Sequence, residues 1–279
     1  MTNHDEGFIE VPGARLYYEA DGTGPPVVLI HAGVAHLRMW DGQVAAWRDG
    51  YRVIRYDTRG FGRTLVEDVP YSNRADLAAV MDHAGVDRAH VLGLSRGAII
   101  ALDFAVEQPA RVRSLTWVAG GVRGLELEDD PREVAMMPEL ERLETEHRWE
   151  ELVELETRLW TDGPGQPSDR VDPEVRRQMR QWNLESYRAE QSANQPIQPD
   201  VVATEALDRL TMPLLVTWGT LDVAPTLASG EWLAANVPGA RRHVFEGVAH
   251  MVNLERRDEF NALVGAFLDD AERGGAGAA

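Results

Sequence analysis

Short apolar segments alternate with amphipathic segments along most of this chain. Apolar runs of strand length occupy residues 15–20, 25–33, 51–57, 89–95, 113–120, 213–219 and 241–247. Helical patterns lie between several of them, at residues 39–48, 74–85, 96–109 and 256–270. Continuous apolar runs are typical of strands buried on both faces, and their alternation with helices is typical of parallel sheets. The pattern therefore predicts an α/β fold with a mostly parallel sheet flanked by helices.

The alternation stops at about Gly121 and resumes after Glu205. The intervening stretch contains two charged, helix-prone segments, residues 138–160 and 172–191, and two loop-like segments rich in proline, TDGPGQPSD and NQPIQPD. We therefore predict a core formed by residues 1–121 and 206–279 and a helical insertion, residues 122–205, over one end of the sheet. The last residues, ERGGAGAA, are expected to be disordered.

The composition excludes several kinds of chemistry. The 279 residues are 44% hydrophobic, which is enough for one large core with an insertion. The chain has no cysteine, so disulfides, thiolate metal sites and cysteine nucleophiles are excluded. All 28 basic residues are arginine, and without lysine the chain cannot form a Schiff base.

The charge balance and the N-terminus bear on partners and location. The net charge is −18, which on average repels nucleic acid and anionic membranes, so we expect neither as a partner. The N-terminal MTNHDEGFIEV lacks the basic and apolar regions of a signal peptide, and no apolar run approaches the length of a membrane span. We expect a cytoplasmic protein.

One serine stands at a junction where a packed fold has no use for a hydroxyl. Residues 93–97 read Gly-Leu-Ser-Arg-Gly and lie between a predicted strand and a predicted helix. In that context G-x-S-x-G indicates a nucleophile elbow, a sharp turn that projects Ser95 at the carboxyl end of the sheet. Two glycines so close together cost backbone entropy, which the crowding of such a turn explains.

A serine nucleophile needs a base and an acid that orients the base. His250 follows the last predicted strand, and Asp222 follows the strand before it, so the chain order is Ser95, Asp222, His250. Asp57 also follows a strand, but we interpret it as a structural residue that holds the adjacent Gly-rich turn through Arg59. His31 is likewise expected to shape a turn.

Two backbone amides are needed to bind a developing oxyanion. The first is expected to be the amide of Arg96, the residue after the nucleophile. The second is expected in the loop after the strand that ends near His31, where we choose Gly33 with Val34 as the alternative.

Five motifs together resemble the α/β-hydrolase superfamily, in particular small bacterial carboxylesterases and 3-oxoadipate enol-lactone hydrolases. They are IHAG at 30–33, YDTRGFGRT at 56–64, GLSRG at 93–97, WGTLD at 218–222 and GVAHMVNLERRDEF at 247–260. The resemblance implies an eight-stranded sheet with a helical cap inserted after strand six. It also implies Ser95 as nucleophile, Asp222 as acid and His250 as base. The usual His-Gly pair of the superfamily is His31-Ala32 here.

Serine at the elbow favours acyl transfer. We expect a hydrolase that cleaves a carboxylic ester or lactone of a small molecule through an acyl-enzyme, with no metal and no organic cofactor. Carbon–carbon bond hydrolysis and perhydrolysis use a similar triad and stay open. A different class also stays open, a ligand receptor or signalling protein of the same fold with little turnover.

The insertion is expected to supply the substrate pocket. Apolar side chains there are candidates for contact with the acyl group, although residues at helical spacing are more often ordinary packing. The candidates are Met136, Trp160, Trp182 and Tyr187.

Overall fold

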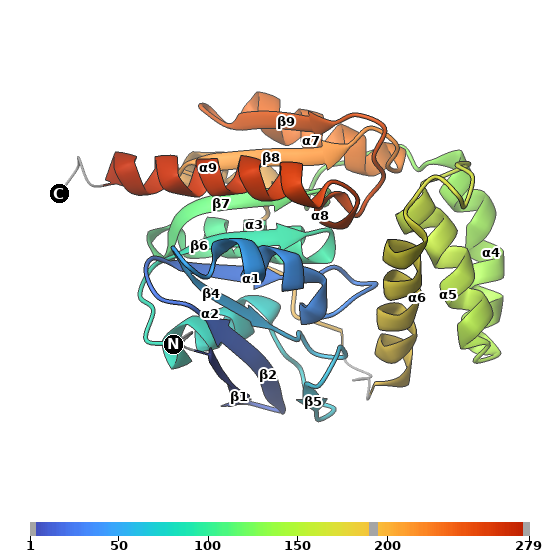
Figure 1. Cartoon of the computed structure of the whole chain (residues 1–279), viewed down its shortest axis with the longest axis horizontal. Coiled ribbons are helices and arrows are strands. Elements are labelled where there is room, and N and C mark those ends of the chain that lie inside the picture. The colour runs from blue at the N-terminus through green and yellow to red at the C-terminus, as the bar shows by residue number, and fades with distance from the viewer. Residues whose placement is uncertain (1–3, 190–194, 276–279) are drawn as a thin grey trace.

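The computed structural model describes residues 4–189 and 195–275. Its centre is a nine-stranded sheet in the order β1-β2-β4-β3-β6-β7-β8-β9, with β5 paired to β2 (Figure 1). The six strands β4, β3, β6, β7, β8 and β9 are parallel to one another along this order. Strand β2 pairs with β1, β4 and β5 in the antiparallel sense. The strands are β1 (His4–Val11), β2 (Ala14–Asp21), β3 (Pro26–Ile30), β4 (Arg52–Tyr56), β5 (Leu65–Val66), β6 (Ala89–Leu94), β7 (Val112–Val118), β8 (Leu214–Gly219) and β9 (Arg241–Phe245).

Helices cover both faces of the sheet, as the sequence pattern predicts (Figure 1). One face carries α1 (Asp41–Trp47) and α9 (Arg257–Gly275), which contact each other. The other carries α2 (Asn73–His83), α3 (Arg96–Glu107) and α7 (Ala224–Asn236). A single-turn helix, α8 (Val252–Glu255), precedes α9. The predicted α/β fold with a mostly parallel sheet is confirmed.

Two strands and one helix escape the sequence pattern. The sheet has nine strands rather than the expected eight. The additional strand, β5, is only two residues long, which is too short for a sequence pattern to indicate. Strand β1 was not among the apolar runs because it is an edge strand with exposed polar residues. Helix α7 lacks a clear amphipathic pattern. The C-terminal expectation is partly wrong, since α9 continues to Gly275; residues 276–279 lie outside the described residues.

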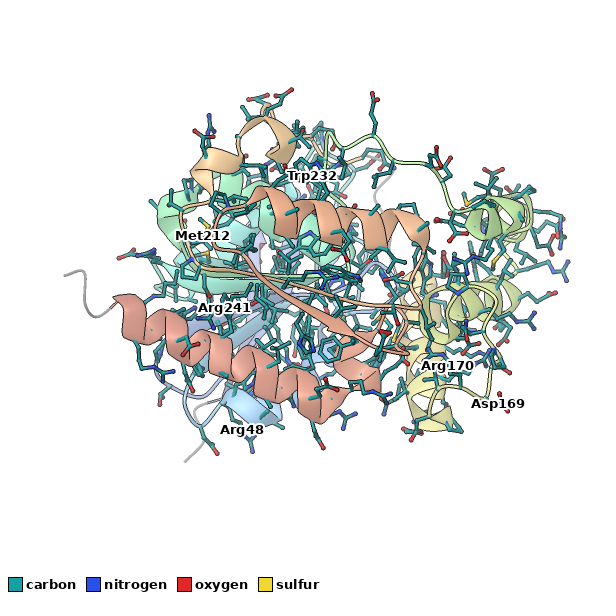
Figure 2. All side chains as sticks on the ribbon, turned by 90° about the horizontal axis from the view of Figure 1, so that it is seen from above. Arg48, Asp169, Arg170, Met212, Trp232 and Arg241 are labelled. Atoms are coloured by element: carbon teal, nitrogen blue, oxygen red, sulfur yellow. The ribbon has the colours of Figure 1, made fainter. Side chains whose placement is uncertain are left out.

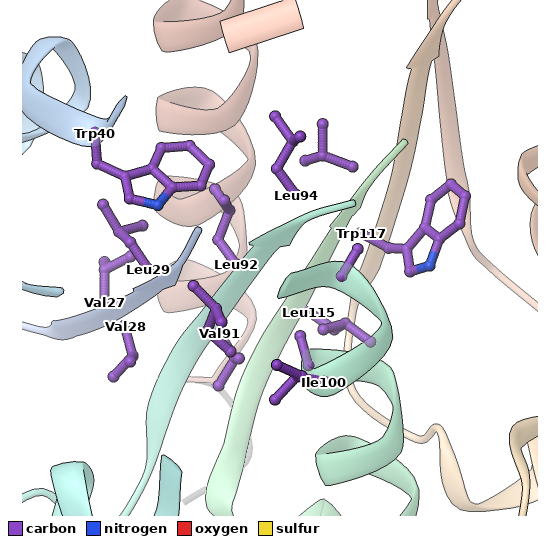
Figure 3. Close-up of a cluster of buried hydrophobic side chains, with 14 of the residues drawn as sticks. Val27, Val28, Leu29, Trp40, Val91, Leu92, Leu94, Ile100, Leu115 and Trp117 are labelled. Atoms are coloured by element: carbon purple, nitrogen blue, oxygen red, sulfur yellow. The ribbon is translucent and has the colours of Figure 1, made fainter. Parts of the chain in front are cut away.

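The centre of the sheet is packed on both faces (Figure 3). Leu29 of β3 is the register partner of Leu92 of β6, and both lie on the face of the Trp40 ring. Val91 lies on the opposite face, toward Ile100 of α3. Each side chain buried in this way contributes about 1.5–3 kcal/mol relative to an exposed one. This packing fixes where β6 ends, and hence where the next residue stands.

Between β7 and β8 the chain forms four helical elements, called the inserted helices here, followed by two short 3-10 turns, Ala203–Glu205 and Leu207–Arg209. The inserted helices are α4 (Pro131–Thr145), α5 (Trp149–Thr157), the π-helical turn η3 (Arg158–Asp162) and α6 (Pro173–Arg188). They stand beside the carboxyl ends of the parallel strands, with α6 nearest the sheet (Figure 1). With the two-residue β5 left aside, β7 is the sixth strand along the chain, the place that the resemblance implies. None of the helices in the described ranges has the length and apolar character of a bilayer span.

Asp57 holds the turn after β4, but through different groups from those expected. Its carboxylate accepts from the amide of Leu37 at 2.9 Å and from that of Arg63 at 2.8 Å. Arg59 instead pairs with Asp76, at 2.8 Å, so the expected bond between Asp57 and Arg59 is wrong. Burial raises the pKa of the Asp57 carboxyl, and the two amides oppose that effect.

We predict that Asp57→Asn destabilises the fold by about 1–3 kcal/mol, because an amide can accept from one of the two N–H groups but presents its own NH2 to the other. Chemical denaturation of the variant and its parent measures the difference. Asp87→Asn, at an exposed carboxyl, is the control and should unfold as the parent does. Equal stability of the Asp57 variant would mean that the turn does not depend on this carboxylate.

Candidate active site

Ser95 occupies a strained turn between β6 and α3. Its φ and ψ are 58° and −120°, in a region that residues with side chains rarely adopt. A Cβ at position 93 would lie 2.0 Å from Gly97 O, and one at position 97 would lie 2.2 Å from Ile30 O. Both glycines are therefore required by close backbone contacts, as the sequence motif predicts.

The backbone around Ser95 is tied on both sides. The Ser95 amide donates to Val118 O at 2.8 Å, and the Ser95 carbonyl accepts from Ala98 at 2.9 Å and Ile99 at 3.1 Å. The side chain is half-buried. Within residues 4–189 and 195–275, no hydrogen bond engages the Ser95 hydroxyl, so this group is available to an incoming substrate.

Asp222 and His250 are in direct contact. The Nδ1 atom of His250 lies 2.7 Å from Asp222 Oδ2, and the two side chains are 4% and 0% exposed. The other carboxylate oxygen, Oδ1, accepts from the amide of Val223 at 2.8 Å. Because an ionised carboxylate can only accept, Nδ1 carries the proton of the neutral ring and Nε2 is left as a base.

The loops that carry these two residues meet because of a close approach at the end of β8. A Cβ at Gly219 would lie 2.2 Å from Val248 O and 2.4 Å from Ala249 O. The amide of Leu221 also donates to Val248 O, at 2.9 Å. The sequence prediction rested on chain order and on the position of both residues after predicted strands, and the structure supplies these contacts.

Parallel pairing brings Ser95 and the Asp222–His250 pair to one edge of the sheet. Ser95 follows β6, and the other two follow β8 and β9, which lie beyond β7 in the same parallel array. The carboxyl ends of parallel strands meet at one edge, where ligands bind in such folds. In the described part of the chain no hydrogen bond joins Ser95 to His250, a contact that often forms only with substrate.

The loop after β3 stands against the start of α3. A Cβ at Gly33 would lie 3.6 Å from the Cδ atom of Arg96. Among the described residues, no hydrogen bond uses the amides of Gly33, Val34 or Arg96. These are the three amides that the sequence predicts for an oxyanion site, and the structure leaves all of them available.

His31 fixes this loop as a neutral ring. Its Nδ1 atom donates to Ala32 O at 2.8 Å, and its Nε2 atom accepts from the amide of Thr58 at 3.0 Å. Burial lowers the pKa of His31 to about 3, so the ring carries no charge near neutrality. The expectation that His31 shapes a turn agrees with these contacts.

The Arg96 side chain leaves the elbow sideways and packs on the turn after β4. Its guanidinium donates to Thr58 Oγ1 at 2.6 Å and to Asn73 Oδ1 at 3.3 Å, and it lies over the Phe61 ring at 4.9 Å. Burial lowers the pKa of Arg96. No carboxylate among the described residues forms a salt bridge with Arg96, and it donates hydrogen bonds to the neutral side chains of Thr58 and Asn73.

Two of the four predicted pocket residues reach the core. Trp160 of η3 packs on His250, with ring centroids 4.9 Å apart, and Trp182 of α6 packs on His36 at 6.0 Å. The π-helical turn displaces Trp160 from the regular α5 helix, and such turns are frequent at functional sites.

For the other two predicted pocket residues, Tyr187 and Met136, no ring contact with the core is found among the described residues. Tyr187 stacks on Trp149 at 5.1 Å, and its hydroxyl donates to Glu156 at 2.8 Å. Met136 is half-buried on α4, and its contact with a substrate stays a prediction.

Glu133 is a titratable residue of the inserted helices that the sequence analysis does not name, and its electrostatic neighbours include Asp222 and His250. It lies half-buried in the first turn of α4, where an acidic residue reads as an ordinary helix start. Burial raises the pKa of Glu133, and the nearby carboxylates of Asp130, Asp129 and Asp222 raise it further.

No cluster of three or more His, Cys, Asp or Glu residues suited to a metal ion occurs in the described part of the chain.

Comparison with known proteins shows the family of this chain. The family model described as "Alpha/beta hydrolase family" matches residues 27–263. The chain is 30% identical over 270 residues to a 2-hydroxy-6-oxononadienedioate/2-hydroxy-6-oxononatrienedioate hydrolase of Burkholderia vietnamiensis, covering 91% of each chain. It is 26% identical to 3-oxoadipate enol-lactonase 1 of Acinetobacter baylyi over 260 residues, 92% of this chain and 94% of the relative.

Solved structures give the same result. The crystal structure of an enol-lactonase from Burkholderia xenovorans superimposes with a TM-score of 0.75 at 28% identity, covering 94% of this chain and all of the other. The match extends over most of both chains. This chain is a member of the alpha/beta hydrolase family.

Proposed function

We propose that this protein is a serine hydrolase that cleaves a carboxylic ester or a lactone of a small molecule through an acyl-enzyme. The observation that carries the proposal is the buried bond between His250 Nδ1 and Asp222 Oδ2, at the sheet edge where Ser95 stands in a strained turn. That bond leaves His250 Nε2 unprotonated and fixes the ring, which are the two requirements of a general base for a serine.

The reaction follows from these groups. Ser95 Oγ attacks the carbonyl carbon while His250 Nε2 takes the hydroxyl proton, and the charge on Asp222 stabilises the imidazolium. The carbonyl oxygen becomes an oxyanion, held by the amides of Arg96 and Gly33, with Val34 as the alternative to Gly33. Collapse breaks the C–O bond, and His250 returns the proton to the leaving oxygen.

The second half of the reaction uses the same groups. Water gives a proton to His250 Nε2 and attacks the acyl carbon, and a second tetrahedral intermediate collapses to the acid and free Ser95. In a lactone the leaving oxygen stays attached to the acyl chain, so one open-chain product forms. This chemistry needs no metal and no organic cofactor.

The relatives are hydrolases, but their names point to more than one kind of cleaved bond. The enol-lactonases support a lactone or ester, whereas the 30% identical relative from Burkholderia vietnamiensis is named as a dienedioate hydrolase, which supports carbon–carbon hydrolysis as the second candidate. Because these relatives are enzymes, we favour turnover over a receptor role. A panel of esters, lactones and vinylogous 1,5-diketones, assayed beside Ser95→Ala, separates the two bond types.

We propose that residues 122–205 form a cap over this site and that the core comprises residues 1–121 and 206–279. The support is that the segment contains all the inserted helices and places Trp160 against His250 and Trp182 against His36. Variable segments at the carboxyl end of a fixed sheet commonly form the roof of a pocket.

The first prediction from the proposed function is that an organophosphonate labels Ser95 and stops hydrolysis, because the elbow presents this hydroxyl at the sheet edge where the proposed base lies. Peptide mapping by mass spectrometry locates the adduct. Ser95→Ala should take up no label and show no hydrolysis above background. Label on another serine, with activity lost, would move the nucleophile elsewhere.

The second prediction is that Asp222→Asn folds normally but loses on the order of 10³ to 10⁴ in kcat, about 4–5.5 kcal/mol of transition-state stabilisation. The amide would donate to Nδ1 and so fix the wrong tautomer of His250. The control is Asp103→Asn, at a buried carboxylate that pairs with Arg123. Near-parental kcat in the Asp222 variant, with the large loss in the Asp103 variant, would assign the acid differently.

The third prediction concerns substrate choice. Trp160→Ala and Trp182→Ala should change the relative kcat/KM values across esters of different acyl length, because both rings contact the core side of the site. The matched control is Trp149→Ala, whose ring stacks on Tyr187 within the inserted helices. If both test variants keep the parental order of substrates, these two rings do not set specificity.

A further inference from the structure

Arg170 joins the inserted helices to the loop that carries His250. It lies where those helices meet the core (Figure 2). Its Nε and Nη2 groups donate to the carbonyl oxygens of Asp162 and Thr161, at 2.8 and 3.0 Å. Its Nη1 group donates to Gly247 O at 3.0 Å and to Glu255 Oε2 at 2.5 Å. One guanidinium thus bonds to two segments that are remote in sequence.

Glu255 continues this connection to the residue before His250. Its second oxygen, Oε1, accepts from the amide of Ala249 at 3.0 Å. The Arg170 and Glu255 side chains are only 15% and 6% exposed, so water screens their charges weakly. Charge-assisted hydrogen bonds of this kind are about twice as strong as neutral ones. The backbone at 247–249 is therefore held by two charged side chains.

Arg170 bonds to residues 161 and 162, which belong to a corner of the inserted helices formed by residues 160–163. The same corner contacts the Asp222–His250 pair or residues next to it. Trp160 packs on the His250 ring at 4.9 Å. Gly163 has a φ of +95°, and a Cβ there would lie 2.9 Å from Leu221 O and 3.1 Å from the Cβ of Ala249. The corner therefore lies directly against Leu221 and Ala249, the residues that precede Asp222 and His250.

We propose that Arg170 and Glu255 are positioning residues for His250. The pair holds the 247–250 backbone and keeps the 160–163 corner against the imidazole, so that Nε2 stays directed at the Ser95 hydroxyl. The inference rests on the proposed function, in which His250 is the base. A displacement of about 1 Å in a catalytic group is enough to lower a rate about 100-fold, so a clamp of this kind has a kinetic effect without touching substrate.

Removal of the clamp should lower kcat and leave KM nearly unchanged. We expect Arg170→Ala and Glu255→Ala each to reduce kcat by about 10- to 100-fold, with KM within about threefold. The double variant should lose little more than either single variant, because both act through one connection. The matched control is Arg177→Ala, which removes an exposed arginine paired with Glu174 inside α6 and should keep the parental kcat.

Chemical rescue distinguishes positioning from general stability. A solvent-accessible cleft of about 750 Å³ is lined by Arg170, Gly247 and Glu255 among others, so a free guanidinium ion can reach the space left in Arg170→Ala. Guanidinium below the molar range that unfolds proteins should restore part of the lost kcat in that variant. It should not raise the kcat of the parent or of Arg177→Ala. Arg170→Lys, which keeps the charge without the fork, should be intermediate.

A spectroscopic measurement decides the inference independently of turnover. The proton on His250 Nδ1, bonded to Asp222, should give a low-field NMR resonance in the parent, and Arg170→Ala should broaden or shift it while Arg177→Ala leaves it in place. If the parent shows no Ser95-dependent hydrolysis, the proposed function fails and this resonance still tests the clamp. An unchanged resonance in Arg170→Ala, or a kcat loss that guanidinium does not restore, would overturn the positioning role.

Discussion

The close packing of backbone around Ser95 is the constraint on which the rest of the site depends. Strand β6 is fixed between β3 and β7, and the turn that follows has no room for a side chain at Gly93 or Gly97. The unfavourable φ of Ser95 persists because hydrogen bonds to Val118 and from α3 hold it. Once that turn is fixed, the strand order places the loops after β8 and β9 at the same edge, where His250 and Asp222 meet.

At this edge of the sheet a carboxylate lies directly against His250, the proposed base. The chain carries a net charge of −18, and the carboxylates nearest His250 include that of Asp222 in direct contact. Arginines of the inserted helices are already paired with carboxylates, as in Arg176 with Asp162. The loop ring His31 stays neutral, because burial lowers its pKa to about 3. In the proposed acyl transfer, the imidazolium formed on His250 would face the carboxylate of Asp222, and the neutral ring of His31 would add no like charge.

The inserted helices contact residues of the proposed catalytic site. Trp160 touches His250, and Arg170 bonds to the same loop, so a change in how these helices sit would reach the base directly. Relatives of similar length are named for lactone hydrolysis and for hydrolysis of dienedioates. A common core thus serves more than one bond type, as expected where fold does not fix function. The residues that select among substrates are best sought where the inserted helices meet the core.

Local sequence determined the parts of this protein that depend on neighbouring residues. Most of the apolar runs are buried strands, such as β6, and the glycines at 93 and 97 are those that the sharp turn at Ser95 requires. Both features depend on residues that are close together in the sequence. Tertiary structure alone decided the rest. Asp57 bonds to Leu37 rather than Arg59, Trp160 packs on His250, and Glu255 joins Arg170 to Ala249. Except for Glu255 and Ala249, which are six residues apart, these partners are 20 or more residues apart in sequence, and such side chains find their partners only after the sheet order and the loops have set which atoms lie within reach.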